Sequence, residues 1–397
     1  MHCDPRFSRV REVFEQHFAD GEELGAAFAV YQDGELVVDL WDGVADRNTG
    51  RPWERDTPAF AYSCTKAVTA TVLLQLAERG LVDVSAPVAD VWPEFAARGK
   101  GAITVEHLLT HQSGLPVLEE PVPVEEFEDQ AAIAARLAGQ EPLWEPGTAH
   151  GYHALTYGFL VGEVVRRVTG KSVGELVAAE IAGPLGLEMW VGAPDDVISR
   201  TARLKAAERP QGLKVTEAGA GPDASGAAPN GQGRPDDVLA AMTKAALDPQ
   251  SLMNRALGNP AMHRVQGGAN NPIILRAGWP AAGLVTTARG LAGFYRSLAA
   301  GDILSPGTLR EATRTRVNGP DRVLLLDTAF GLGYMRPSLT FLMPAASAFG
   351  HSGMGGSIGL GDPERGLGIA YVMNKMANAL SGNLRGIRLV EAVYQSI

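Results

Sequence analysis

Cysteine is nearly absent from this chain of 397 residues, in which only Cys3 and Cys64 occur. Two cysteines cannot form a framework of disulfide bonds in a chain of this length, and they suit a reducing compartment. Long hydrophobic runs are absent too. The sequence has no stretch of about 18 apolar residues, which is the length that a membrane-spanning helix needs. The charged, amphipathic N-terminus lacks the apolar centre of a signal peptide. We therefore expect a cytoplasmic protein with no membrane partner.

A basic surface is also missing. The formal net charge is −10, and no local cluster of lysine and arginine offsets it. Binding of nucleic acid requires a basic face that neutralises phosphates, so we expect no nucleic-acid partner. Hydrophobic residues make up 45% of the chain, which is enough to build the core of one large domain or of two interlocked ones.

Strand patterns lie near both ends of the chain. Asp33-Gly34 separates two β-rich runs, which is a strong signal for a β-hairpin. The late segments RVLLL, FGLGYM, SIGLG and GLGIAYVMN predict further strands. Helical patterns cover 7–19 at the start of the chain, 63–79 after the first strands, 287–300 before the late strands and 383–396 at the end.

The middle of the chain, about 81–280, has the pattern of helices joined by loops. Thr104 is a suitable N-cap, residues 154–168 predict a helix, and Ser172 with Glu175 predicts a capping box. Residues 206–236 are too weakly patterned to bury much surface, so we expect a mobile loop or flap there.

These patterns predict an α/β (α+β) architecture in which both ends of the chain build one domain. That domain comprises 1–80 and 281–397, and it holds an antiparallel sheet flanked by helices. The segment 81–280 is then an inserted all-helical domain. No internal repeat is present.

Ser63-Cys64-Thr65-Lys66 has the spacing S-x-x-K at the predicted start of an apolar helix. A separation of three places the hydroxyl and the amine on one helix face, near the positive end of the helix dipole. Serine becomes a good nucleophile only when a base takes its proton, and lysine is such a base only when its pKa falls. Lowering that pKa from about 10.4 to about 7 costs roughly 4–5 kcal/mol, which burial can supply. By itself, however, the spacing fits a capping serine and a solvated lysine better.

Three longer blocks accompany this spacing, and they are ITVEHLLTHQSGLP at 103–116, WEPGTAHGYHALTYG at 144–158 and GHSGMGG at 350–356. In this order and at these separations, the four blocks resemble the class C β-lactamase and penicillin-binding-protein superfamily over about residues 25–395. The resemblance implies a serine β-lactamase-like fold and two-step acyl transfer, with no cofactor and no metal.

By the same resemblance, Ser63 matches the acylated nucleophile, Lys66 matches its partner, and Tyr152 matches the tyrosine of the family's Y-x-N element. Which of Lys66 and Tyr152 is the general base stays open, because the two should titrate as a coupled pair. The family's oxyanion hole consists of two backbone N–H groups, which here belong to Ser63 and Met354.

The K-T-G element of the family is matched by His351-Ser352-Gly353, which we expect to contact the substrate. Trp279 is a further candidate for the lining of the acyl pocket. Two positions depart from the lactamase pattern, because Ala154 replaces the asparagine of Y-x-N and His351 replaces the lysine of K-T-G. A site without that cation and that amide favours neutral esters. These departures resemble the family VIII carboxylesterases.

For several other motifs we favour a structural role over a catalytic or metal-binding one. Gly355-Gly356-Ser357-Ile358-Gly359 fits the G-x-S-x-G elbow, but a second strand follows it where the elbow needs a helix. His107 and His111 have metal-ligand spacing, yet Leu108 stands where a zinc protease has glutamate. Cys64 is expected to be a small core residue rather than a reactive thiol. Tyr157 is the second choice for the role of Tyr152.

The favoured hypothesis is a serine carboxylesterase that hydrolyses short-chain acyl or aryl esters, small molecules, through an acyl-enzyme on Ser63. A second hypothesis is hydrolysis of an amide, either a β-lactam, a D-alanyl amide or another small amide. A third, of another class, is a non-catalytic binding or assembly protein with the same fold. The sequence leaves the oligomeric state and the acyl and alcohol preference open.

Overall fold

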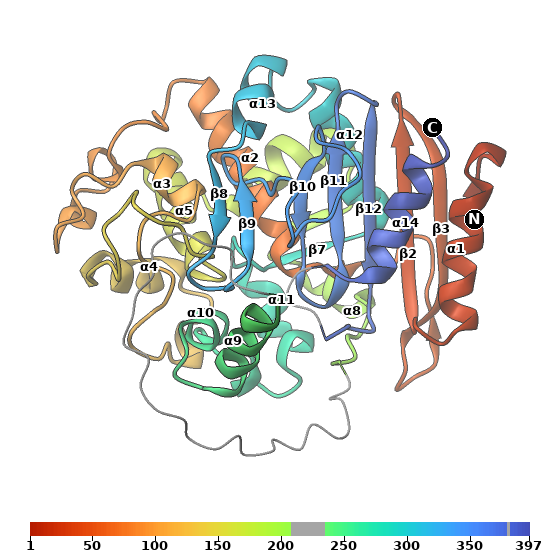
Figure 1. The fold of residues 1–397 in the computed structure, drawn as a ribbon, viewed down its shortest axis with the longest axis horizontal. Helices are drawn as coiled ribbons and strands as arrows, with labels where there is room; N and C mark the ends of the chain where they lie inside the picture. Colours follow the sequence, from red (N-terminus) through yellow and green to blue (C-terminus); the bar gives the residue numbers. More distant parts are fainter. Residues whose placement is uncertain (208–234, 379–381) are drawn as a thin grey trace.

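The computed structural model describes residues 1–207, 235–378 and 382–397. The predicted mobile loop at 206–236 therefore falls almost wholly outside the described residues. A seven-stranded antiparallel sheet stands at the centre, with strand order β1-β3-β2-β12-β11-β10 and β4 paired to β3 (Figure 1). Its strands are β1 (His2–Cys3), β2 (Gly25–Gln32), β3 (Glu35–Asp46), β4 (Arg51–Pro52), β10 (Phe349–Ser352), β11 (Ile358–Asp362) and β12 (Leu367–Met373).

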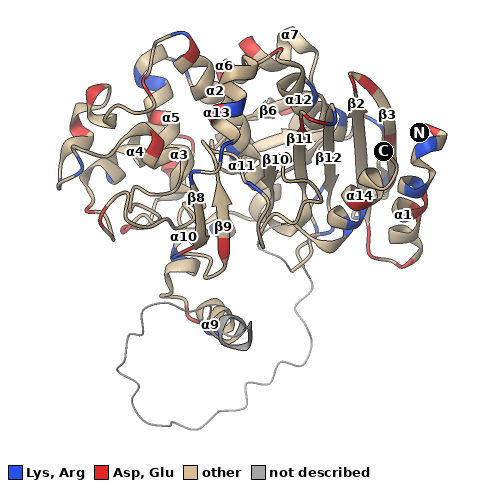
Figure 2. Cartoon of the chain, turned by 45° about the horizontal axis from the view of Figure 1, so that its top comes forward, with Lys and Arg blue, Asp and Glu red and all other residues tan. Residues whose placement is uncertain are grey.

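This sheet joins the two ends of the chain, as the strand patterns predicted. β2 pairs with β3 through the predicted turn at Asp33-Gly34, and β11 pairs with β12 in the predicted late hairpin. The two hairpins meet where β2 pairs with β12. No charged residue lies in β2, β10 or β12, and Figure 2 shows the charged residues mainly on the outer elements.

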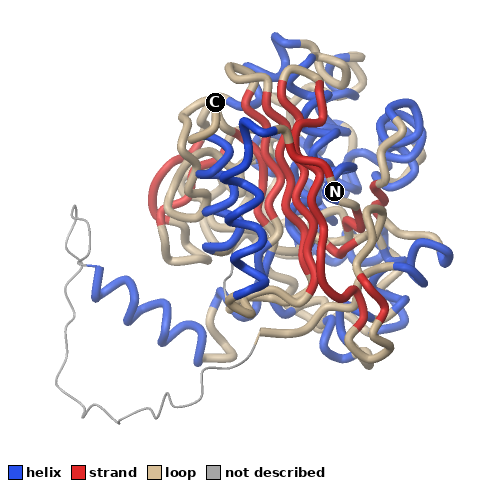
Figure 3. The backbone as a smooth tube through the Cα atoms, turned by 90° about the vertical axis from the view of Figure 1, so that its right-hand side faces the viewer, coloured by secondary structure: helices blue, strands red, loops and turns tan. Residues whose placement is uncertain are grey.

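Helices cover both faces of the sheet (Figure 3). On one face α1 (Ser8–Ala19) packs against α14 (Leu384–Tyr394), and on the other α12 (Ala288–Ala300) packs across β2, β11 and β12. Alternate residues of β12 enter the two cores, with Ile369 and Tyr371 toward α1 and α14 and Ala370 toward α12. The predicted helices at 7–19, 287–300 and 383–396 are thus confirmed.

On the face of the sheet that α12 covers, the strands carry glycines because the helix lies very close to them. A Cβ added to Gly359 would come within 2.5 Å of Tyr295, and one added to Gly368 would come within 2.5 Å of Ala292 O. Gly359 belongs to the G-x-S-x-G segment, so close packing explains that glycine without any nucleophile elbow.

The rest of the molecule is mainly helical. A three-stranded sheet of order β5-β7-β6 joins it to the part of the chain that carries the central sheet. Its strands are β5 (Ala59–Phe60), β6 (Met189–Val191) and β7 (Leu284–Thr286). The segment 81–280 is therefore not wholly helical, because it contributes β6. The division into two domains stays a prediction.

Among the remaining helices, α2 packs mainly against α5. These helices are α2 (Thr65–Glu78), α3 (Val105–Leu109), α4 (Gln130–Gly139), α5 (Thr156–Thr169), α6 (Val173–Leu176), the π-helix Val177–Ala182, α7 (Gly183–Leu185), α8 (Asp195–Arg200), α9 (Pro235–Leu247), α10 (Leu252–Gly258), α11 (Pro272–Ala277) and α13 (Pro306–Thr313). Both predicted caps are confirmed, since Thr104 Oγ1 accepts the N–H of His107 and Ser172 shares a capping box with Glu175. No helix among the described residues is both long and apolar enough to cross a membrane.

Two predicted strands were wrong. RVLLL at 322–326 is the turn between β8 (Val317–Pro320) and β9 (Asp327–Phe330). The carboxylate of Asp321 accepts the N–H groups of Val323 and Leu324 at 2.8 and 2.9 Å, and these bonds fold the chain back on itself. In the FGLGYM segment only Phe330 belongs to a strand.

Candidate active site

Ser63 lies in a short 3-10 turn, Tyr62–Cys64, that leads into α2. The α-helix itself begins at Thr65, two residues later than predicted. Thr65 Oγ1 donates to Tyr62 O at 2.5 Å and accepts the N–H of Leu284 at 2.9 Å, so the turn is tied both to the helix and to β7. Ser63 is partly exposed, whereas its neighbours Cys64 and Thr65 are buried.

Lys66 is fully buried one helical turn beyond Ser63. Its Nζ donates to Ser63 Oγ at 3.2 Å, to Ala154 O at 2.7 Å and to Ala281 O at 3.1 Å. These three acceptors are neutral, so no carboxylate balances a charge on the amine. Burial therefore holds the pKa of Lys66 well below its usual value.

The two carbonyl groups reach Lys66 because α5 packs closely against the segment before β7. A Cβ on Gly158 would stand 2.3 Å from the backbone nitrogen of Ala281, so glycine permits this approach. The carbonyl of Ala154 occupies the position in the sequence where the lactamase pattern has asparagine. The backbone at 154 thus provides a hydrogen-bond acceptor for Lys66 although the amide side chain is missing.

Tyr152 meets the same pair of residues from the loop before α5. Lys66 Nζ lies 4.6 Å from the centre of the Tyr152 ring. Burial raises the pKa of Tyr152 above its usual value, and the nearby hydroxyl of Ser63 opposes this rise. The predicted trio of Ser63, Lys66 and Tyr152 is therefore brought together.

The end of β10 runs beside the turn that carries Ser63. Cys64 Sγ donates to His351 O at 3.4 Å, and a Cβ on Gly353 would stand 2.4 Å from Ala61 O. Beyond the strand, Met354 begins a 3-10 turn, Met354–Gly356. Ser63 and Met354 both lie in the first turn of a helical segment, where backbone N–H groups have no acceptor within the segment and are available to an oxyanion.

His351 carries no positive charge into this site. Its ring is buried, its centre lies 6.1 Å from that of Tyr152, and its Nδ1 pairs with Ser352 O at 2.7 Å. Burial and the nearby Lys66 lower the pKa of His351 to about 3. The ring is therefore neutral at pH 7, as expected for a replacement of the K-T-G lysine that loses a cation.

Trp279 does not line the site as predicted. Its indole is buried in the core, where Nε1 donates to Phe127 O at 2.7 Å and the ring packs edge-on against Phe127 and Phe159. Its backbone carbonyl accepts the N–H groups of Ala282 and Gly283, so Trp279 shapes the turn that presents Ala281 O to Lys66.

The competing residues are used elsewhere. The phenol of Tyr157 donates to the backbone carbonyl of Lys66 at 3.3 Å, not to the serine. Burial raises the pKa of the Cys64 thiol to about 12, which excludes a thiolate at neutral pH. Ser357 is fully buried and followed by β11, in disagreement with a nucleophile elbow. His107 Nδ1 and His111 Nδ1 accept the N–H groups of Thr104 and His153.

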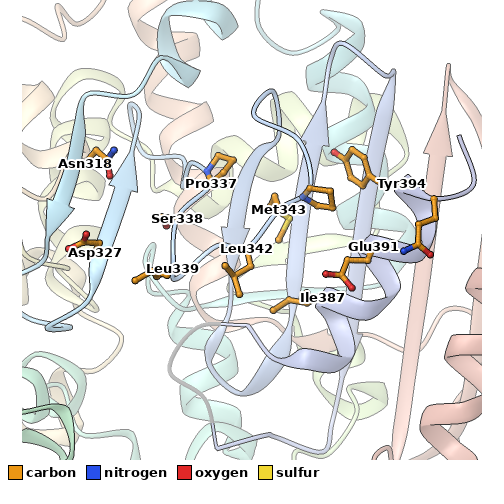
Figure 4. Close-up of a pocket in the computed structure, with 12 residues that line it drawn as sticks. Asn318, Asp327, Pro337, Ser338, Leu339, Leu342, Met343, Ile387, Glu391 and Tyr394 are labelled. Carbon is orange, nitrogen blue, oxygen red and sulfur yellow. The ribbon is translucent and has the colours of Figure 1, made fainter. Parts of the chain in front are cut away.

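A groove of about 990 Å³ lies apart from these residues, between the segment 337–344 and α14 (Figure 4). Leu339, Leu342 and Ile387 line it together with several polar side chains, and none of the predicted catalytic residues does. The candidate site is therefore defined by its hydrogen bonds and its buried amine rather than by the size of a groove.

Asp321 lies beside the candidate site and was not predicted from the sequence. Asp321 Oδ1 accepts the backbone N–H of Tyr152 at 3.0 Å. The signal was present in Gly319-Pro320-Asp321, because aspartate after proline is typical of a turn rather than of a strand.

Known proteins are similar to this chain in both sequence and fold. A family model described as Beta-lactamase matches residues 10–394. The Esterase/beta-lactamase LipL of Mycobacterium tuberculosis is 37% identical over 388 residues, which cover 95% of this chain and 83% of that protein. A family VIII carboxylesterase structure has a TM-score of 0.85 and 36% identity, covering 100% of this chain and 99% of the other. A penicillin-binding-protein homologue from Caulobacter crescentus has a TM-score of 0.83 and 39% identity over the same shares.

The chain therefore belongs to the Beta-lactamase family. It is a serine hydrolase of the β-lactamase fold, and the predicted resemblance and fold class are confirmed.

Proposed function

We propose that this protein is a carboxylesterase that forms an acyl-enzyme on Ser63 and acts on small, neutral esters with short acyl or aryl groups. The observation that carries the proposal is the buried amine of Lys66, which is hydrogen-bonded to Ser63 and has no carboxylate partner. A neutral amine has two hydrogens, which it can donate to the carbonyls of Ala154 and Ala281, and its lone pair can then accept the serine proton, whereas a charged amine cannot do so.

The directions of the two pKa shifts support separate roles for Lys66 and Tyr152. Burial lowers the pKa of Lys66 and so favours its neutral amine, and burial raises the pKa of Tyr152 and so favours the protonated phenol. Lys66 is then the proton acceptor and Tyr152 the proton donor at the start of the reaction. The two remain coupled through the hydroxyl of Ser63, so they share the pH dependence.

Acylation then proceeds as follows. Ser63 Oγ attacks the ester carbonyl carbon while its proton passes to Lys66, and the negative charge on the carbonyl oxygen is met by the N–H groups of Ser63 and Met354. As the bond to the alcohol oxygen breaks, Tyr152 gives its proton to that oxygen and receives one from Lys66. In deacylation a water molecule gives a proton to the same pair, attacks the acyl carbon and releases the acid, and Ser63 regains its proton.

Two features favour neutral esters over anionic substrates. The neutral ring of His351 offers no fixed charge for a carboxylate, and the side chain of Ala154 offers no amide to the substrate. Among the relatives, Esterase EstB of Burkholderia gladioli is 31% identical over 198 residues, which are 45% of this chain and 50% of that protein, and LipL has esterase in its name. The expected cytoplasmic location and the absence of a membrane or nucleic-acid partner stay predictions.

The second candidate is hydrolysis of a β-lactam, which the name of LipL supports. Both reactions would use the same serine, so the substrate and not the nucleophile separates them. Turnover of a chromogenic cephalosporin faster than that of a short nitrophenyl ester would reverse our ranking.

The test of the nucleophile compares two serines. Ser63→Ala should lower turnover of a short-chain nitrophenyl ester at least about 10³-fold, because the acyl-enzyme cannot form. Ser357→Ala is the matched control, since Ser357 belongs to the competing G-x-S-x-G motif and should retain turnover. Wild-type activity in Ser63→Ala would refute the proposal.

A fluorophosphonate probe with peptide mapping addresses the non-catalytic alternative. The probe should add to the peptide that contains Ser63 in the wild type, and no label should appear in Ser63→Ala. A folded wild-type protein that is never labelled would favour a binding or assembly function.

A further inference from the structure

A buried carboxylate lies behind the tyrosine of the candidate site. Asp321 is almost completely buried at the start of the β8–β9 turn. Its Oδ1 accepts three backbone N–H groups, those of Tyr152, Val323 and Leu324, at distances of 2.8–3.0 Å. Two of these bonds make the turn, and the third reaches a residue 169 positions away in the sequence.

Asp321 Oδ2 takes part in a second connection between the β8–β9 hairpin and the loop that carries Tyr152. Thr328 Oγ1 donates to Asp321 Oδ2 at 3.1 Å and also pairs with His150 Nε2 at 2.9 Å. The N–H of Arg322 donates to His150 O at 3.1 Å. The hairpin of β8 and β9 is therefore fastened to the loop at 150–152 at three places.

The loop needs such support because it is irregular backbone. Residues 149–153 belong to no helix or strand, so the sheet and helix ladders do not hold them. Gly151 N–H donates to His111 O and His153 N–H to His111 Nδ1, each at 3.0 Å. Asp321 completes the set by accepting the amide between them, that of Tyr152.

We infer that Asp321 is a positioning residue for catalysis, whose carboxylate holds the backbone of Tyr152 so that the phenol meets Ser63. The inference rests on the proposed function and adds a residue outside the four sequence blocks. An error of about 1 Å in the place of a catalytic group lowers a rate by about 10²-fold, so a residue that only holds the backbone can control turnover.

The experiment compares three substitutions on the short-chain nitrophenyl ester. Asp321→Ala removes every acceptor and should lower kcat about 10²-fold while KM changes less than about 3-fold, because Tyr152 acts in the transition state. Asp321→Asn keeps an oxygen for the three N–H groups and should recover kcat to within about 5-fold of the wild type. Asp327→Asn removes an exposed carboxylate from the same hairpin and should leave kcat unchanged.

A double-mutant cycle with Tyr152→Phe separates positioning from a merely structural role. If Asp321 acts through the phenol, Asp321→Ala should lower kcat much less in the Tyr152→Phe background than in the wild type. An equal loss in both backgrounds would overturn the inference. Should Asp321→Ala fail to fold, Asp321→Leu takes its place, because it also lacks an acceptor while filling the space of the carboxylate, and wild-type kcat in that variant would also overturn the inference.

The controls keep this inference apart from the proposed function. Full turnover in Ser63→Ala would refute the acyl-enzyme whatever Asp321 does. An inactive Ser63→Ala together with wild-type kcat in folded Asp321→Ala would refute only the positioning role.

Discussion

Two of the buried basic side chains among the described residues, Lys66 and Arg385, lie in opposite surroundings. Lys66 donates only to a hydroxyl and two backbone carbonyls, beneath the candidate site. Arg385 at the start of α14 donates to Glu23 Oε2 at 2.6 Å, and both side chains are almost fully buried. The phenol of Tyr371 donates to the other oxygen of Glu23.

The difference separates the base that we propose from a structural ion pair. Without a negative partner, burial favours the neutral form of Lys66, and the same holds for the nearby rings of His153 and His351. Around Arg385, burial raises the pKa of Glu23 to about 6, and the guanidinium opposes this rise, so the carboxylate is charged at pH 7. One region is thus made ready for proton transfer, and the other holds α14 to the sheet.

The largest loss of activity is expected when the amine of Lys66, which has no carboxylate partner, is removed. Lys66→Met should lower kcat on the ester by about 10³–10⁴-fold, because no base then takes the proton of Ser63. Lys100→Met is the matched control, since Lys100 Nζ also donates only to carbonyls, those of Ala97 and Gln140. Steady-state kinetics with both variants should show the loss in Lys66→Met alone, and an equal loss in both would contradict the comparison.

Breaking the ion pair should affect stability rather than chemistry. Arg385→Met leaves Glu23 buried without its partner and should cost about 3–5 kcal/mol of unfolding free energy, measured by urea denaturation. The double variant with Glu23→Gln should recover part of this loss. If Arg385→Met has the same free energy of unfolding as the wild type, the ion pair with Glu23 does not stabilise the fold.

Acid should destabilise the protein through its uncharged histidines. The pKa values of His153 and His351 are about 3, below the ordinary value of 6.5, so the unfolded chain binds more protons between these limits. The free energy of unfolding should therefore fall as pH drops below about 6.5, by about 2 kcal/mol for each ring at pH 5. Glu23 acts in the opposite direction between 4.5 and about 6.

Urea titrations at pH 7 and pH 5 measure this loss. His351→Asn should make the profile less steep, because the ring of His351 no longer contributes. A wild-type profile that is flat over this range would contradict the prediction, because it would show that the folded protein binds as many protons as the unfolded chain.

The smallest effect is expected at the second tyrosine. Tyr157→Phe removes a 3.3 Å bond to the carbonyl of Lys66 and should cost about 1 kcal/mol of stability or less, with kcat within about 3-fold of the wild type. Tyr152→Phe in the same assay should lose at least about 10² in kcat. Reversed results would exchange the roles of the two phenols.

Most of the fold was predictable because it depended on local pattern, whereas the candidate trio was predicted from the resemblance of the four sequence blocks to a known family. Ser63, Lys66 and Tyr152 belong to contiguous blocks, and the hairpin at Asp33-Gly34 has its own turn signal. The segment RVLLL was assigned wrongly because an apolar run alone does not reveal the carboxylate of Asp321 that bends it.

The remaining features depend on partners that sequence cannot place. Asp321 is recognisable as a turn residue, but its bond to Tyr152 joins distant segments of the chain. Two of the three acceptors of Lys66 are backbone carbonyls, and a carbonyl leaves no trace in residue identity. Trp279 was assigned to the site wrongly because its partner, Phe127 O, is also backbone.

The pairing of β2 with β12 sets a limit on how the protein is made. Residues 25–32 must find residues 367–373, so the middle of the sheet cannot close until almost the entire chain has left the ribosome. During synthesis β2 has a bare edge, and chaperones or rapid collapse of the first hairpin must keep it from pairing with another nascent chain.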